Sequence, residues 1–243
     1  MNFRVRVCIL AMAMDTAVCA FAAHPLQTED TGTQGRGNVE IENGLSWTRT
    51  HNATIFVYQP QFSYGLTEAL DLIVQPSWVR GSDARGFGDT NLDAKWRFFG
   101  EGSWSAGVRA GTTLATNQNG LGLPHGDASP HAAFIVTYEA APFTAHANVG
   151  AAVFPTTEAQ RRVVWRTSTA VMWAATDKLV WAGEVVANRD PDAARGTWPA
   201  LVLGAMIYTV RTGLDVDLGY QVSSGARPST HQFLMGLTYR FAP

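Results

Sequence analysis

Hydrophobic and polar residues alternate strictly along residues 89–115, in two segments joined by the sequence GEG. In the first segment, the apolar phase holds Thr90, Leu92, Ala94, Trp96 and Phe98, and the polar phase holds Asp89, Asn91, Asp93, Lys95 and Arg97. The second segment repeats the pattern with Trp104, Ala106, Val108, Ala110 and Leu114 against Ser105, Gly107, Arg109, Gly111 and Thr113. A period of two indicates β-strands, so these residues are predicted to form a hairpin with one apolar and one charged face.

The same alternation recurs from Gly37 to the end of the chain without a linker or a break in composition. About twelve segments show it, each roughly 10 to 13 residues long, a length that suits tilted strands crossing a membrane. The segments are 38–49, 54–65, 70–78, 89–99, 104–115, 131–139, 143–153, 162–174, 179–188, 199–208, 213–222 and 231–241. Pro60 and Pro76 fall inside two of them, where we expect a bulge or weakened pairing because proline interrupts a ladder.

The connections between these segments alternate in length. Short links are expected at 66–69, 99–103, 140–142, 175–178 and 209–212. Longer links, rich in Gly, Asn, Asp and Pro, are expected at 81–88, 116–130, 154–161, 189–198 and 223–230, and only the link at 50–53 breaks the rule. Short turns at one end and longer loops at the other, on an even number of strands, are the layout of a bacterial outer-membrane barrel.

The tryptophans decide which face of the strands meets lipid. Seven of the eight follow the apolar phase, mostly near strand ends, where the aromatic girdle of a membrane barrel lies. They are Trp47, Trp78, Trp96, Trp104, Trp165, Trp173 and Trp181, while Trp198 lies at a loop edge. The core of a soluble barrel could not hold so many large rings, so we predict an all-β, closed antiparallel transmembrane β-barrel with an apolar outside and a polar lumen.

Composition agrees with a membrane barrel. Charged residues make up 16% of the chain and hydrophobic residues 46%, and charge is therefore scarcer than the roughly 25% of ordinary soluble domains. A formal net charge of −2 gives no reason to expect a nucleic-acid partner.

The N-terminus resembles a secretory signal. Residues 1–23 combine a basic start, an apolar run and small residues, so cleavage is expected after Ala22 or Ala23. Cys8 and Cys19 lie inside this segment, and the mature chain would therefore have neither disulfides nor Cys-ligated metals. We divide the chain into a signal peptide at 1–23, a polar periplasmic leader at 24–37, which we expect to be flexible, and the barrel at 38–243.

The polar phase predicts the lining of the lumen and of a solute path. Its members are Glu40, Glu42, Gln59, Gln61, Asp71, Gln75, Asp93, Lys95, Arg97, Arg109, Glu139, His146, Arg166, Glu184, Asp215, Asp217 and Arg240. Two readings stay open: the charges select solutes in a polar channel, or they neutralise one another and fill a narrow interior.

Turn positions predict three cross-strand ion pairs among these residues. With a turn centred at Glu101, Asp93 lies opposite Arg109. With a turn centred at Thr176, Glu184 lies diagonal to Arg166. Arg240 on the last segment is expected to meet Glu40 or Glu42 where the barrel closes.

Catalytic and metal sites find little support. Ser129 and His131 share a face, but a turn centred at Ala141 places His131 opposite Ala151 rather than Asn148, and no acid partner is evident. His131 and His146 are out of register, which argues against a shared metal. His24 with Glu29 and Asp30 could bind a metal, although a polar leader is the simpler interpretation. We predict no enzyme activity, no metal and no cofactor.

The last segment carries a second mark of a membrane barrel. Its apolar phase holds Phe233, Met235, Leu237, Tyr239 and Phe241. Its ending, Tyr-Arg-Phe, resembles the terminal aromatic signal that the barrel assembly machinery reads, although Ala242 and Pro243 follow.

Four stretches together resemble the outer-membrane family named for the MetA pathway of phenol degradation. They are HPLQTEDTGTQGRG at 24–37, YGLTEALDLIVQPSW at 64–78, GFGDTNLDAKWRFF at 86–99 and GLTYRF at 236–241. The resemblance implies a twelve-strand-like barrel and the uptake of small, often aromatic, molecules, and it supplies no catalytic residue.

The hypothesis from sequence is therefore a passive uptake channel of the cell outer membrane for small, hydrophobic or aromatic molecules. Its expected partners are outer-membrane lipid and lipopolysaccharide, the barrel assembly machinery through the C-terminal strand, and a small-molecule solute. The alternatives are an outer-membrane hydrolase of lipase or protease type, and a closed structural or adhesive barrel.

Overall fold

A computed structural model describes residues 24–49, 54–81, 85–118, 127–155, 161–224 and 230–241. The expected signal peptide at 1–23 and the whole of the link at 50–53 lie outside these residues. Within the described ranges, no helix is long and apolar enough to cross a membrane.

The described chain forms fourteen β-strands, all paired antiparallel. They are β1 (Val39–Arg49), β2 (Thr54–Thr67), β3 (Leu70–Gln75), β4 (Trp78–Arg80), β5 (Arg85–Phe87), β6 (Thr90–Glu101), β7 (Trp104–Leu114), β8 (Ala128–Ala140), β9 (Phe143–Val153), β10 (Val163–Ala174), β11 (Leu179–Asn188), β12 (Ala200–Arg211), β13 (Leu214–Ser224) and β14 (His231–Phe241).

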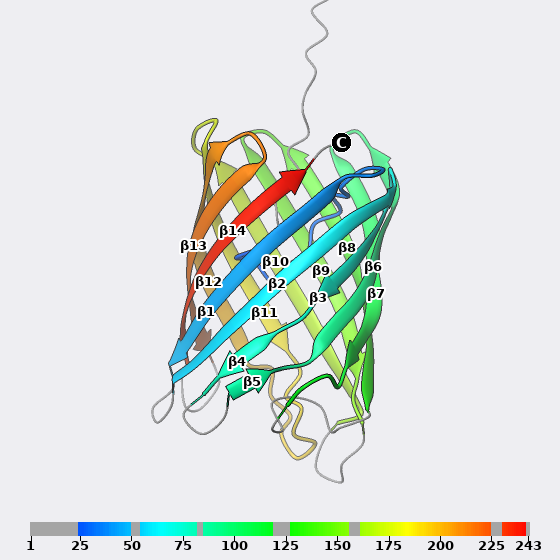
Figure 1. Ribbon diagram of the computed structural model, residues 1–243, viewed down its shortest axis with the longest axis vertical. Coiled ribbons are helices and arrows are strands. Elements are labelled where there is room, and N and C mark those ends of the chain that lie inside the picture. The colour runs from blue at the N-terminus through cyan, green and yellow to red at the C-terminus, as the bar shows by residue number, and fades with distance from the viewer. Residues whose placement is uncertain are drawn as a thin grey trace, which may run out of the picture.

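The sheet closes on itself (Figure 1) because β1 pairs with β2 on one side and with β14 on the other. The seam with β14 is continuous from Val39 opposite Phe241 to Arg49 opposite His231. β3 and β4 are successive parts of one wall strand, and β5 pairs only with β4, so the wall is a barrel of twelve strands. The predicted fold class is confirmed.

The two prolines mark a gap in the wall. The ladder between β2 and β3 ends at Phe62 opposite Val74, and the ladder between β2 and β4 begins at Tyr58 opposite Trp78. Both ladders share one register, which places Pro60 directly opposite Pro76 in the unpaired stretch between them. The predicted weakening of strand pairing is confirmed. The link expected at 81–88 differs, because residues 85–87 form β5.

The barrel has two different ends. Short turns join β2 to β3, β6 to β7, β8 to β9, β10 to β11 and β12 to β13, and they lie with the end of β14 at the top of Figure 1. We call this the turn end, and the opposite end, with the longer connections, the loop end. Gly102 and Gly213 lie in two of the short turns with φ of +57° and +77°, a conformation that other residues rarely adopt.

The outer face carries the tryptophans. Trp47, Trp96, Trp104, Trp165, Trp173 and Trp181 are between 38% and 54% exposed, whereas Trp78 is less so. Their outward phase is confirmed.

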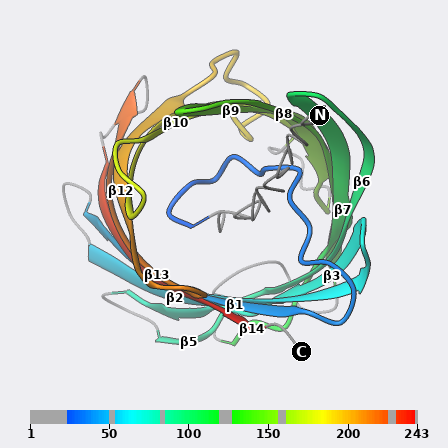
Figure 2. The ribbon, with the colours of Figure 1, turned by 90° about the horizontal axis from the view of Figure 1, so that it is seen from above.

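The interior differs from the sequence picture in two ways. Residues 24–37 run inside the barrel (Figure 2), so the expectation of a free, flexible leader is wrong for this segment. We call these residues the lumen segment. In addition, the lumen is not polar throughout, because β10–β12 turn a buried apolar cluster inward, whose members are Ala170, Met172, Val180, Ala182, Leu203, Ala205 and Ile207.

Candidate functional site

The lumen segment is held by its backbone. The N–H groups of Gln27 and Thr28 both donate to Glu184 Oε1, at 2.8 and 2.5 Å. The side chain of Asn148 on β9 accepts from the N–H of Glu29 at 2.7 Å and donates to its carbonyl at 2.9 Å. Buried backbone groups need partners, and here side chains of the wall supply them in place of a strand ladder.

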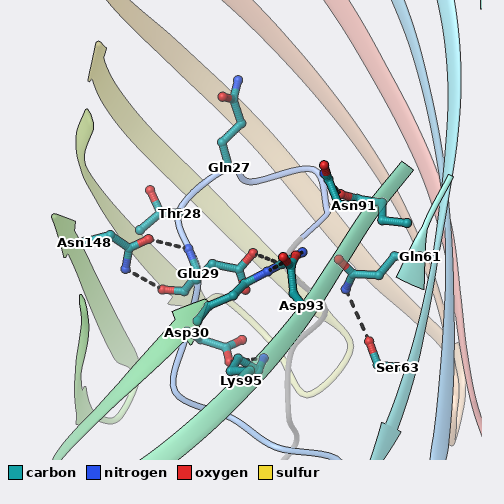
Figure 3. Close-up of polar contacts among 12 residues, drawn as sticks. Gln27, Thr28, Glu29, Asp30, Gln61, Ser63, Asn91, Asp93, Lys95 and Asn148 are labelled. Carbon is teal, nitrogen blue, oxygen red and sulfur yellow. Dashed lines mark hydrogen bonds and ion pairs between the residues drawn. The ribbon is translucent and has the colours of Figure 1, made fainter. Parts of the chain in front are cut away.

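A row of charged side chains lies between the segment and β6–β7, and Figure 3 labels four of its members, Glu29, Asp30, Asp93 and Lys95. Arg109 bonds Glu29 of the segment, and it donates to Asp93 Oδ2 from Nη2 at 2.6 Å and from Nε at 2.9 Å. Lys95 Nζ lies 3.6 Å from Asp30 Oδ1. We call these five side chains the charge row. Glu29 and Asp30 of the lumen segment thereby neutralise Arg109 and Lys95 of the wall.

His24 occupies a notch in the wall. Its backbone nitrogen donates to Glu42 Oε2 at 3.1 Å, and its ring Nδ1 lies 2.8 Å from Asp217 Oδ1. The ring lies against Gly44 and Gly236, which are directly opposite each other across the β1–β14 seam. A Cβ at Gly44 would come 2.7 Å from the imidazole, so only glycine leaves room for this ring.

Leu26 gives the segment an apolar anchor. Its side chain is 8% exposed and belongs to the same cluster as Leu203 and Leu234. Burying a leucine stabilises a structure by about 1.5–3 kcal/mol. The segment is therefore seated by an apolar contact on one side of the barrel and by the charge row on the other.

Two cavities lie on either side of the segment. The larger, about 570 Å³, opens toward the loop end, and Glu29 is among its lining residues. The smaller, about 430 Å³, lies toward the turn end and is lined in part by Asp30. Consecutive residues of the lumen segment, Glu29 and Asp30, thus line different cavities.

The structure confirms the contact of one predicted ion pair but corrects its register. Asp93 bonds Arg109, yet Asp93 lies opposite Gly111, and Arg109 lies opposite Lys95. The cause is the position of the turn. Glu101 lies opposite Trp104, so the turn is centred between Gly102 and Ser103 rather than at Glu101, and the irregularity between Arg97 and Phe99 moves the pairing back by only one residue.

The other two predicted pairs have opposite outcomes. Arg240 lies opposite Glu40, with Nε 2.7 Å from Oε2, and it also bonds Asp215 at 2.6 Å, so Glu40 is the partner. The pair of Glu184 with Arg166 is wrong. The lumen segment separates them, because Gln27 donates to Glu184 and accepts from Arg166.

The predicted lumen residues fall into three groups. Glu42, Gln59, Gln61, Gln75, Asp93, Arg109 and Arg166 line the loop-end cavity. Arg97, Glu139 and His146 line the turn-end cavity. Glu40, Asp71, Lys95, Glu184, Asp215, Asp217 and Arg240 are engaged with the lumen segment or with one another. Whether these residues form a solute path stays a prediction.

Sequence reasoning missed the residues of the segment that occupy the lumen. Gln27, Glu29, Asp30 and Gln34 all contact wall side chains. The sequence did contain a signal. Residues 24–37 carry the carboxylates Glu29 and Asp30, and the polar phase of the predicted strands carries cations such as Lys95 and Arg109.

The structure gives His131 an acidic partner, but not the hydroxyl of Ser129 that the catalytic alternative needs. His131 Nε2 lies 2.7 Å from Asp93 Oδ1, while its Nδ1 lies 3.3 Å from the backbone carbonyl of Ser129 rather than from the hydroxyl. Asn148 binds the lumen segment. These side chains form no nucleophile and base pair.

The leader residues weighed as a metal site are dispersed. His24, Glu29 and Asp30 pair with Asp217, Arg109 and Lys95 respectively. In the part of the chain that the structure describes, no three His, Cys, Asp or Glu side chains gather closely enough to hold a metal ion.

Two connections at the loop end are tied together. Arg161 Nη2 donates to the carbonyls of Ala193 and Arg195, each at 3.0 Å. Within the second connection, the backbone N–H of Asp192 lowers the pKa of Asp190, to which Thr197 also donates. Side chains therefore order this part of the loop end.

Comparison with known proteins identifies a family and a fold. The family described as "Putative MetA-pathway of phenol degradation" matches residues 22–241. No curated protein matches the sequence significantly.

Solved structures share the barrel at low identity. An outer membrane channel from Pseudomonas putida F1 is 12% identical, with a TM-score of 0.73 over 89% of this chain and 100% of that one. The KdgM porin in complex with disordered oligogalacturonate is 8% identical, with a TM-score of 0.63 over 84% and 99%. The CymD monoaromatic hydrocarbon channel is 9% identical, with a TM-score of 0.56 over 88% and 90%. Such identities establish the likeness of fold alone.

Proposed function

The chain belongs to the family of the MetA pathway of phenol degradation, and from this premise we propose that it is a passive outer-membrane channel for small molecules. In this proposal a signal peptide at 1–23 directs export, and the barrel assembly machinery recognises β14. The tryptophan-rich outer face meets lipid and lipopolysaccharide. The turn end faces the periplasm and the loop end faces the outside.

The observation that carries the proposal is the pair of cavities on either side of the lumen segment. Glu29 lines the loop-end cavity and Asp30 the turn-end cavity, and both are bound to cations of β6–β7 through the charge row. Displacing the segment would join the cavities into a path along the barrel axis. The lumen segment is thus proposed as a plug, and transport as diffusion down a gradient.

The lining of the loop-end cavity indicates the class of solute. Leu45, Val57, Ala132 and Phe154 supply apolar surface, and polar side chains such as Gln59 and Asn91 lie among them. A small molecule with an aromatic or aliphatic body and one polar group fits such a lining. The family name and the channel for monoaromatic hydrocarbons among the similar structures support the same class.

Planar-bilayer recording tests the proposal. Refolded protein beginning at His24 is compared with a shortened variant beginning at Arg36, which lacks most of the lumen segment. We expect small, intermittent conductance from the first and steady, severalfold larger conductance from the second. A heat-sensitive shift in gel mobility for both proteins controls for barrel folding.

Two negative results together would contradict the channel. If the shortened, folded variant neither conducts ions nor admits small phenols into liposomes, the barrel is closed. A structural or adhesive barrel would then account better for the filled lumen and the ordered connections at the loop end.

A hydrolase is the weaker alternative. We propose no catalytic role, because the hydroxyl of Ser129 is not the partner of His131. Assays with a lipid ester and a peptide substrate are expected to show no turnover above background. Turnover that Ser129→Ala and His131→Ala both abolish would reverse this view.

A further inference from the structure

Glu42 is a buried carboxylate with hydrogen bonds but without a cation. It is 5% exposed, and its oxygens accept from the backbone nitrogen of His24 at 3.1 Å and from Gln61 Nε2 at 2.6 Å. Among the described residues, no Lys, Arg or His side chain forms an ion pair with it. By contrast, the neighbouring Glu40 pairs with Arg240.

Burial without a counterion is costly for a carboxylate. Two neutral N–H donors satisfy its lone pairs, but they do not supply the charge that a desolvated anion needs. An ammonium group in the place of one of those donors would supply a hydrogen bond and a positive charge at once. The donor that could become an ammonium is the backbone nitrogen of His24.

Signal cleavage creates such a group at this place, and this step rests on the export assumed in the proposed function. Hydrolysis breaks the peptide C–N bond, with the hydroxyl of water going to the acyl carbon and its proton to the nitrogen. The new amine takes up a further proton at neutral pH. Cleavage after Ala23 leaves this group on His24 itself, and cleavage after Ala22 leaves it one residue earlier.

We propose that the α-ammonium group released by signal cleavage lies inside the lumen and is the counterion of Glu42. Processing then completes the seat of the lumen segment. The imidazole is fixed by Asp217 and the glycine notch, and the new N-terminus is fixed by Glu42. Before cleavage the same nitrogen is a neutral amide, so the carboxylate keeps only hydrogen bonds.

The chain suits a direct measurement, because its only lysines are Lys95 and Lys178. Full-length precursor is expressed, and the processed protein is purified from outer membranes and weighed by mass spectrometry. Reductive methylation with ¹³C-formaldehyde then labels three amines while keeping their charge. Lys178→Arg removes the signal of Lys178, which lies in an exposed turn, and so identifies that signal.

Three results are expected. The mass places the N-terminus at His24, because an N-terminus at Ala23 would leave the His24 nitrogen a neutral amide. The α-amino signal of the native protein titrates at least one pH unit above the range of about 7.7–8.0 that is usual for this group. Glu42→Gln returns the midpoint to that range, whereas Glu139→Gln, the same change in an exposed lumen carboxylate, does not.

Other results would overturn the proposal. An N-terminus elsewhere, or a native α-amine that titrates in the usual range, would do so without any variant. If Glu42→Gln fails to fold, Glu42→Asp retains the charge and is expected to keep a raised midpoint, and loss of the shift there would count against the ion pair. None of these readouts requires conductance, so failure of the channel proposal is distinguishable.

Discussion

Asp93 bonds Arg109 across β6 and β7 although the residue directly opposite Asp93 is Gly111. The absence of a side chain at Gly111 makes the contact possible. A Cβ there would clash with the Asp93 carboxylate and with the carbonyl of Leu92.

Gly111→Ala is therefore expected to lower the free energy of unfolding by roughly 1–3 kcal/mol, because the added methyl forces the carboxylate or the backbone to move. Urea unfolding in lipid vesicles, followed by tryptophan fluorescence, measures the change. Gly183→Ala is the matched control, since a Cβ at Gly183 meets nothing within 4 Å. Equal effects from both variants would contradict the assigned role of Gly111.

Leu26→Ala is expected to release the lumen segment without unfolding the barrel. Truncating a buried leucine costs roughly 2–5 kcal/mol, and here that loss falls on the docking of the segment. Single-channel conductance should rise toward that of the variant beginning at Arg36. Leu66→Ala, the same truncation at a residue that is 44% exposed, should leave conductance unchanged.

Gly236→Val is expected to expel His24 from its notch, since a Cβ at this glycine collides with the imidazole and with Asp217. Residues 24–243 contain no cysteine, so a single Thr28→Cys substitution, at a residue that is 1% exposed, can report the position of the segment. Maleimide labelling of this cysteine should be severalfold faster in the Gly236→Val background. Gly204→Val, where a Cβ meets nothing within 4 Å, should leave labelling slow, and fast labelling there would invalidate the readout.

Leu218→Arg tests the assignment of the outer face to lipid. Leu218 lies near the middle of β13 and is 52% exposed, so an arginine there is expected to cost about 2–4 kcal/mol of unfolding free energy. Val210→Arg, near the end of β12 and 45% exposed, should cost only about 0–1 kcal/mol. Equal costs at the two depths would argue against a membrane around the barrel.

Most of the wall could be predicted from the sequence, because most strands follow the same two-residue period. The tryptophan phase fixed inside and outside, and the seam pair of Arg240 with Glu40 followed from joining the first strand to the last. The two prolines also behaved as expected between β2 and β3–β4, because proline has no N–H to donate to a ladder, although the ladder of β2 with β1 passes Pro60 without a break.

Three features could not be predicted from the period alone. The turn between β6 and β7 is centred past Gly102 rather than at Glu101, and together with the irregularity between Arg97 and Phe99 it places Arg109 two positions from its predicted partner. Such a shift leaves no mark in an alternating pattern. The apolar interior of β10–β12 resembles a lipid face, since both phases of residues 201–207 are largely apolar. Apolar and polar residues do not alternate in the lumen segment, so only its charged residues indicated that it binds the charged side chains of the wall.

The notch that receives His24 sets an order of events in folding. Its parts come from opposite ends of the chain: Gly44 and Glu42 from β1, Asp217 from β13 and Gly236 from β14. The notch exists only when the last strand has met the first, so the lumen segment, which precedes every strand in the chain, can reach its final place only after β14 has paired. Seating of His24 is then a late kinetic step, and its contacts report that the barrel has closed.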